Sequence, residues 1–147
     1  MSYNKWIFFF SLMLFALNSY SQTIKKNKVK FQVQLKSVEN YREKLKNTTT
    51  YIYKNGQLID TIFSKNGHVL TTLDKGNFYK IKFFKSQHVS KYVIVNTIEI
   101  PIELKRKIKL KADINLFKYH KEIETGFLKT SPVSIAYYNF LKKTLIW

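Results

Sequence analysis

The side chains of this 147-residue sequence that could do chemistry are mainly lysines, accompanied by few acids and three histidines. His120 and Glu124 are four residues apart, a spacing that would let them share a metal ion if the segment were helical. A lone pair of this kind is more often a solvated surface pair. The close carboxylate pairs, Glu99 with Glu103 and Glu122 with Glu124, have lysines beside them, which favours ion pairing over acid–base catalysis. The sequence therefore predicts no enzyme, no metal site and no cofactor.

Net charge gives the strongest signal about partners. With 26 lysines and arginines against 9 acids, the formal charge is +17, a field that attracts nucleic acid, lipopolysaccharide and acidic glycans. Only Arg42 and Arg106 are arginines, although base- and phosphate-reading proteins favour arginine. We therefore expect weak polyanion binding and no specific nucleic-acid recognition. The candidate polyanion contacts are the lysines of two alternating segments: Lys80, Lys82, Lys107, Lys109 and Lys111.

The first 21 residues have the organisation of a secretory signal peptide. Lys5 precedes the apolar run 6–17, and Ser19 and Ser21 then provide the small residues that a signal peptidase reads. The run is shorter than the roughly 20 residues of a spanning helix, so we expect cleavage between Ser21 and Gln22 and no transmembrane span in the mature chain. The absence of cysteine excludes disulfides, thiolate metal sites and lipidation of a cysteine. The sequence thus predicts an exported protein of the periplasm, the outer membrane or the extracellular space.

Apolar residues recur at every second position through most of the remaining chain, which is the period of a β-strand. The clearest strand covers 29–36, and Asn55-Gly56 and Asn66-Gly67 lie between apolar stretches as hairpin turns do. A further alternating run covers 106–118, and the only helical candidate is 38–46. Short strands with turns at about 8–12-residue spacing predict an all-β fold, either an antiparallel sandwich or a barrel.

The stretch that begins at Phe78 separates its aromatic from its basic side chains. Lys80 and Lys82 alternate with Tyr79 and Phe83, so a strand here would bury the aromatic residues and leave the lysines in water. Stacking on nucleic-acid bases would instead need aromatic residues beside the lysines on one face. The alternation therefore predicts a structural role for this stretch.

The order of these elements resembles a known secreted module. The stretch "YIYKNGQLIDTIFSKNGHVLTTLDKGNFYKIKFFKSQHVSKYVIVNT" is similar to the carboxypeptidase-regulatory-like, transthyretin-like module of secreted bacterial proteins, with its pattern L-x-x-G-x-x-Y-x-I-x-F-x-K. That pattern is filled by Leu73, Gly76, Tyr79, Ile81, Phe83 and Lys85. More narrowly, "INLFK" at 114–118 and "PVSIAYYN" at 132–139 resemble a group of envelope proteins of Gram-negative bacteria, in which a Pro-Val-x-x-Ile-Tyr-Tyr tail follows the module.

The resemblance also implies a division of the chain. It implies a single Ig-like, transthyretin-like antiparallel β-sandwich of about seven strands over residues 22–118, after a signal peptide at 1–21 and before a C-terminal extension at 119–147. Members of the group usually continue beyond the tail, so truncation of the extension is one expectation. The regulatory modules of the family have no catalytic residues, which implies a structural, linking or adhesive role.

Aromatic residues are dense near the end of the chain. Tyr137, Tyr138 and Trp147 are candidates for docking on a partner or on a membrane surface, since lysines lie between them. The alternative is a last strand or strap packed on the sandwich, because exported proteins rarely leave such a patch bare. The sequence leaves both interpretations open.

Two hypotheses of function follow from the sequence. In the first, the protein is a non-catalytic module of the bacterial cell envelope that is structural or binds an envelope protein, for example by edge-strand pairing. In the second, it is a lysine-rich binding module for an anionic glycan, a lipid head group or another polyanion.

Overall fold

The computed structural model describes residues 28–40 and 42–147. The predicted signal sequence, 1–21, and its cleavage site between Ser21 and Gln22 lie outside the described residues. No helix within the described ranges is long and apolar enough to cross a membrane.

Strands make up nearly all of the regular structure, as the period-two pattern predicts. The nine strands of the described residues are β1 (Lys28–Ser37), β2 (Thr48–Lys54), β3 (Gln57–Ser64), β4 (His68–Asp74), β5 (Phe78–Phe84), β6 (Lys91–Asn96), β7 (Ile108–Leu116), β8 (Ser134–Asn139) and β9 (Thr144–Ile146). A single-turn helix, α2 (Phe127–Thr130), lies between β7 and β8.

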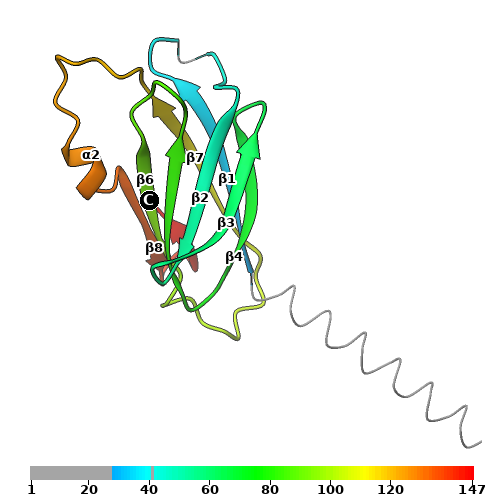
Figure 1. Cartoon of the computed structure of the whole chain (residues 1–147). Helices are drawn as coiled ribbons and strands as arrows, with labels where there is room; N and C mark the ends of the chain where they lie inside the picture. Colours follow the sequence, from blue (N-terminus) through cyan, green and yellow to red (C-terminus); the bar gives the residue numbers. More distant parts are fainter. Residues whose placement is uncertain (1–27, 41) are drawn as a thin grey trace, which may run out of the picture.

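The strands form two sheets that face each other across one core (Figure 1). The three-stranded sheet has the order β4-β1-β7, and the six-stranded sheet has the order β3-β2-β5-β6-β8-β9. This arrangement confirms the predicted all-β sandwich. It differs from the prediction in two details: there are nine strands instead of about seven, and β1–β7 and β6–β8 are parallel pairs in an otherwise antiparallel fold.

Both parallel pairs join segments that are far apart in the sequence. Val29 pairs with Ile108 in the three-stranded sheet, and Val93 pairs with Ser134 in the six-stranded sheet. Parallel neighbours need a crossover connection, which the chain between the paired strands provides. The predicted C-terminal extension, 119–147, thus contributes two strands, β8 and β9, to the six-stranded sheet.

The helical candidate 38–46 is not a helix in its described residues. They form turns and an isolated bridge between Lys36 and Lys44. Leu45 is buried in the core, and its backbone N–H donates to the carbonyl of Leu35 at 3.0 Å. A segment this short is a poor helix nucleus, so the tertiary pairing decides its conformation.

The core lies between the inner faces of the two sheets. Alternate residues of β1 and β5 are at most 1% exposed, and they are Val29, Phe31, Val33, Leu35, Tyr79, Ile81 and Phe83. Each fully buried side chain of this size stabilises the fold by roughly 1.5–3 kcal/mol relative to its exposed state. The prediction that Tyr79 and Phe83 are core residues is therefore confirmed.

Glycine is required at two turns, and the reasons differ. The β2–β3 hairpin turns at Asn55 and Gly56, whose φ angles of 50° and 88° fit a tight hairpin with two left-handed positions. The β3–β4 turn has Gly67 at φ 71°, and a Cβ there would overlap the carbonyl oxygen of Leu45. Gly67 is thus required for its conformation and also for the space that it leaves empty.

The turn from β4 to β5 is held by the tyrosine of the pattern L-x-x-G-x-x-Y and by Thr97, which follows β6. The Tyr79 hydroxyl accepts the backbone N–H of Asp74 at 2.9 Å. The buried hydroxyl of Thr97 lies within hydrogen-bonding distance of the carbonyl oxygens of Asp74 and Asn77, at 2.9 and 2.8 Å. The pattern therefore specifies a turn and its anchor in the core, which is information about the fold.

Candidate functional site

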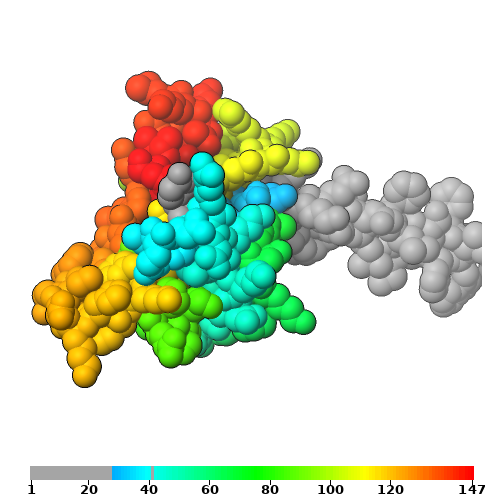
Figure 2. Space-filling view, turned by 90° about the horizontal axis from the view of Figure 1, so that it is seen from above, coloured from blue at the N-terminus to red at the C-terminus, as the bar shows by residue number. Residues whose placement is uncertain are grey.

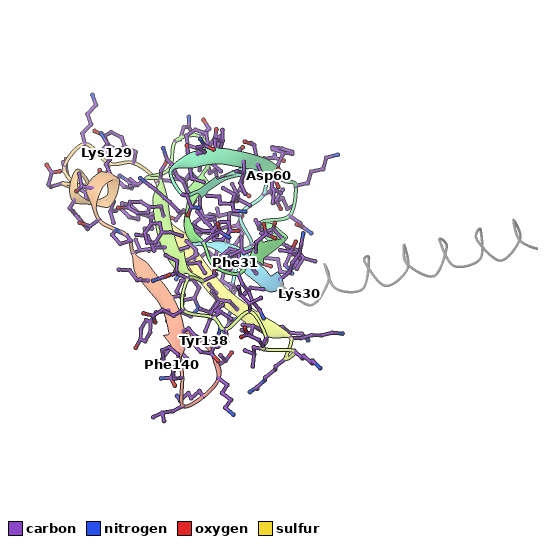
Figure 3. The ribbon with its side chains drawn as sticks, turned by 90° about the horizontal axis from the view of Figure 1, so that it is seen from below. Lys30, Phe31, Asp60, Lys129, Tyr138 and Phe140 are labelled. Atoms are coloured by element: carbon purple, nitrogen blue, oxygen red, sulfur yellow. The ribbon has the colours of Figure 1, made fainter. Side chains whose placement is uncertain are left out.

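The five predicted polyanion contacts are divided between the two outer faces of the sandwich. Lys80 and Lys82 project from β5 on the outer face of the six-stranded sheet. The others directly precede β7 or belong to it, on the three-stranded sheet: Lys107, Lys109 and Lys111. In Figure 3, Lys30 of β1 and Lys129 of α2 lie on opposite sides of the molecule. The chain therefore presents two separate lysine-rich surfaces.

On the three-stranded sheet, lysines of neighbouring strands stand side by side. Lys30 of β1 is the direct partner of Lys109 of β7. The other two lysines of β1 form ion pairs, Lys28 with Asp74 and Lys36 with Asp113. Lys30 and Lys109 are like charges at directly opposed positions, which is unfavourable for pairing of the strands. Together they create a local positive potential on this face. This face suits weak attraction of polyanions.

The outer face of the six-stranded sheet places tyrosines beside its two lysines. Lys82 lies between Tyr51 of β2 and Tyr92 of β6, and Lys80 has Tyr53 as its direct partner on β2. The ammonium of Lys80 is 4.3 Å from the centre of the Tyr92 ring, a cation–π contact. Alternation within one strand carries no information about the neighbouring strands. The prediction that Tyr79 and Phe83 are core residues stands, and it is the order of the strands that brings the tyrosines of β2 and β6 beside the lysines.

A long connection between β7 and β8, residues 119–130, forms an arch beside β6. The arch ends in α2 and projects from the sandwich in Figures 1 and 2. Its first residue, Tyr119, donates its backbone N–H to the carbonyl of Gln87 at 2.9 Å. The carbonyl of its last residue, Thr130, accepts the hydroxyl of Tyr92 at 2.7 Å. Both ends of the arch are therefore attached to the chain segment that runs through β6.

A groove of about 800 Å³ lies between the arch and the outer face of β5 and β6. Its walls contain five lysines, which are Lys80, Lys82, Lys91, Lys121 and Lys129. The arch also contributes two carboxylates and two large side chains, which are Glu122, Glu124, Tyr119 and Ile123. Because charged groups from three parts of the chain converge on this arch groove, it is the candidate site.

Lys91 is held in place by its neighbours. Its ammonium donates to the carbonyl of Asn115 at 2.6 Å and lies 5.0 Å from the centre of the Phe117 ring. Burial lowers the pKa of Lys91 from its usual value. The Lys91 side chain therefore connects β6 to the end of β7. The two lysines of the arch, Lys121 and Lys129, are exposed.

The residues considered for metal binding do not assemble into a site. His120 and Glu124 lie in a part of the arch that is not helical, so they do not share a helix face. Across the described ranges, no group of three or more histidine, aspartate and glutamate side chains is placed to hold a metal ion. Glu122 and Glu124 instead line the groove among lysines.

The three aromatic residues predicted to dock on a partner occupy different environments. Tyr138 is only 4% exposed and packs edge-on against Phe140, with ring centres 5.1 Å apart, so burial corrects the docking prediction for this residue. Trp147 donates its indole N–H to the carbonyl of Lys111 at 2.8 Å and so ties the end of the chain to β7. Tyr137 is 47% exposed. The alternative of a packed last strand describes Tyr138 and Trp147.

β3 is an open edge of the six-stranded sheet and pairs with β2 alone among the described strands. Apolar side chains are exposed along it, with Leu58 and Ile59 at 53% each and Phe63 at 60%. Its single charge is Asp60, which Figure 3 places well away from Lys129. Edge strands commonly carry lysine, proline or bulges that discourage pairing with another chain. β3 has an irregularity of the bulge type at Ile59, where its register with β2 shifts, but it contains no lysine and no proline.

Sequence reasoning found the β2–β3 hairpin but missed its exposed edge and the groove. The available signal for the edge was two adjacent apolar pairs, Leu58-Ile59 and Ile62-Phe63, which put apolar side chains on both faces of one strand. The arch groove had no comparable signal, because its lysines come from segments separated in the sequence.

Comparisons with known proteins give a likeness of fold. No protein-family model matches the sequence, and no curated protein matches it. Among solved structures, the chain is similar to the Bacillus anthracis TIE protein, with a TM-score of 0.48 and 18% sequence identity. The match covers 62% of this chain and 17% of that chain, so this chain spans a small part of the length of that protein. The fold itself is an all-β sandwich of two sheets.

Proposed function

We propose that this protein is a non-catalytic, exported module of the bacterial cell envelope that binds a partner protein through the β3 edge. The observation that carries the proposal is the row of exposed apolar side chains on an unpaired edge strand: Leu58, Ile59 and Phe63. The signal-like organisation of residues 1–21 supports export. The pattern from Leu73 to Lys85 supports assignment of the sandwich to the carboxypeptidase-regulatory-like, transthyretin-like modules.

The edge offers a row of unpaired backbone N–H and C=O groups, with which an extended partner segment can pair as an additional strand. Backbone hydrogen bonds would then provide affinity, and side chains would provide specificity. Leu58 and Phe63 lie opposite Tyr53 and Thr49 of β2 on the outer face. A partner strand therefore needs apolar residues at alternate positions on that face.

Charge favours an acidic partner segment. The formal charge of the chain is +17, and exposed Lys65 directly follows β3. Asp60 is the single charge of the strand itself. We therefore propose an extended segment of an envelope protein, with apolar residues in alternation and acidic residues at its ends, because complementary charge speeds and orients association.

Cysteine cross-linking tests this proposal, because the chain contains no cysteine. Thr61→Cys places a thiol in the middle of β3, and Lys30→Cys places one on the central strand of the other sheet, both at exposed positions. In cells that export the protein, position 61 is expected to capture one partner and position 30 none. A cross-linked dimer of the chain with itself, or equal capture at the two positions, contradicts the proposal.

A pair of matched double variants tests the edge itself. Ile59→Lys with Phe63→Lys places charge on β3 and is expected to abolish capture through position 61. Leu70→Lys with Ile98→Lys adds the same charge at apolar positions that are 50% and 57% exposed elsewhere, and it should preserve capture. Equal loss in both double variants would show a general charge effect and overturn the β3 assignment.

A further inference from the structure

We propose that the arch groove binds an acidic saccharide, a sugar chain that carries carboxylate or phosphate groups. The groove lies over β5 and β6, whereas the proposed partner contact uses the edge strand β3. The two proposals therefore rest on different residues and can fail separately.

Lysines on both walls provide recognition of the anionic groups. Lys80 and Lys82 project from the sheet, and Lys121 and Lys129 belong to the arch that faces it. An anionic group between the sheet and the arch can therefore accept hydrogen bonds from both sides. Hydrogen bonds of this charge-assisted kind are about twice as strong as those between neutral groups.

Two carboxylates of the groove favour an acidic saccharide as ligand over a polyanion that has no hydroxyl groups. Glu122 and Glu124 line the same groove as the lysines. A continuous phosphate chain would be repelled by these like charges, whereas sugar hydroxyls can donate hydrogen bonds to them. The mixture of ammonium and carboxylate groups therefore suits a ligand that combines anionic substituents with hydroxyls.

The size and the apolar side chains of the groove agree with this ligand class. Its volume of about 800 Å³ lies in the range of roughly 300–1,000 Å³ that is typical of pockets for drug-sized ligands. Tyr119 and Ile123 of the arch are 58% and 48% exposed and line the groove. The apolar face of a sugar ring can pack on these side chains, and the Tyr119 hydroxyl adds a polar contact.

The arch is anchored before a ligand arrives. Tyr119 at one end and Thr130 at the other are hydrogen-bonded to Gln87 and Tyr92 respectively. Buried Leu128 of α2 also packs towards the sheet (8% exposed). Binding therefore needs less ordering of the arch than a loop without such anchors, which preserves affinity.

Two double variants of equal charge test the groove. Lys80→Gln with Lys82→Gln removes two charges from the groove, and Lys107→Gln with Lys109→Gln removes two from the opposite face. The probe is trigalacturonic acid, titrated by calorimetry at about 0.15 M salt, and its full methyl ester is the neutral control. Loss of the groove lysines should weaken binding at least about tenfold. Loss of the opposite lysines should change it less than about twofold.

Lipid-borne groups of the same chemistry need their own experiment. Phosphatidylcholine vesicles are compared with and without a lipid that has a phosphorylated glucosamine head group. Binding of trigalacturonic acid alone supports the groove and identifies a free glycan, and groove-dependent binding to the glucosamine vesicles supports it and identifies a head group. Equal losses in the two double variants overturn the proposal. Binding of the methyl ester as tightly as the acid, or no binding to either probe, also overturns it.

Amide chemical shifts provide a readout that does not depend on the variants. Addition of trigalacturonic acid should shift the signals of Lys80, Tyr92 and residues 119–130 and leave those of β3 unchanged. Shifts centred on β1 and β7 would refute the groove. This titration contains no partner protein, so failure of the groove leaves the edge contact, which cross-linking at position 61 tests, unaffected.

Discussion

The hydroxyl of Tyr79 accepts a hydrogen bond of 2.9 Å from the backbone N–H of Asp74, across the turn that joins β4 to β5. Tyr79 is 1% exposed, and burial raises the pKa of its hydroxyl. β4 belongs to the three-stranded sheet and β5 to the six-stranded sheet. One buried side chain thus fills the core and fixes the crossing between the two sheets.

Tyr79→Phe removes only this hydroxyl. We expect the free energy of unfolding to fall by about 1–3 kcal/mol, because the Asp74 N–H loses its acceptor while the volume of the ring is kept. Urea unfolding followed by circular dichroism measures the change. Tyr137→Phe, at an exposed position, is the matched control and should stay within about 0.5 kcal/mol. Equal effects of the two variants would show that the hydrogen bond contributes nothing.

Two glycine-to-alanine variants separate the cost of a left-handed backbone conformation from the cost of a steric clash. Gly56→Ala should cost about 1–2 kcal/mol, the penalty for a left-handed residue, because no atom lies within 4 Å of the added Cβ. Gly67→Ala should cost about 3 kcal/mol or more, since it adds a clash with the Leu45 carbonyl to the same penalty. Thermal and urea unfolding measure both. A smaller loss for Gly67→Ala than for Gly56→Ala would contradict the close approach.

The hydroxyls of Thr48 and Thr50 are buried on the inner face of β2. Neither has a hydrogen-bond partner among the described residues. Thr50→Val keeps the shape of the side chain and removes the unsatisfied group. We expect it to raise the free energy of unfolding by about 1 kcal/mol. Thr49→Val, on the outer face of the same strand, controls for β-propensity and should change stability by less than about 0.5 kcal/mol. A loss of stability in Thr50→Val would reveal a partner for the hydroxyl.

Glu39 links the loop after β1 to the end of β7. Its carboxylate accepts the backbone N–H of Lys118 at 2.9 Å and the hydroxyl of Ser37. These bonds, that from Lys118 foremost, lower the pKa of Glu39 from 4.5 to about 2. The folded protein thus favours the charged form. The resulting stability is present above about pH 4.5 and is lost as the pH falls towards about 2.

Glu39→Gln is therefore expected to flatten the fall in the free energy of unfolding between about pH 4.5 and about 2. The side chain is exposed, so solvent screening keeps the effect small. Urea unfolding at a series of pH values measures the slope. Glu99→Gln, at another exposed position, should leave the slope as it is. If Glu39→Gln has the wild-type slope, the two hydrogen bonds do not stabilise the fold in solution.

Local patterns predicted the parts of the fold that depend on neighbouring residues. The inner face of β1 follows from alternation, which any stretch of strand reveals by itself. The Asn55-Gly56 hairpin follows from two adjacent residues that tolerate positive φ. In both cases the determining interactions lie within a few residues of one another, so one sequence was sufficient.

The features of the fold and of the site that depend on contacts between distant segments could not be predicted from local sequence patterns. Nothing in the β1 sequence indicates that Val29 pairs in parallel with Ile108. The neighbours of Lys80 are likewise set by the order of strands in the sheet, which brings Tyr53 and Tyr92 beside it. The groove depends on one further non-local event, the placement of the arch over β6.

The central place of β1 in the three-stranded sheet has a kinetic consequence. One of its two partners, β7, begins about 80 residues later in the sequence, since Val29 pairs with Ile108, so these native contacts of β1 have high contact order and form only after a long loop has closed. A nascent chain on the ribosome cannot complete this sheet until most of its residues have been made. In the export proposed above, this order of strands would delay folding until translocation can begin.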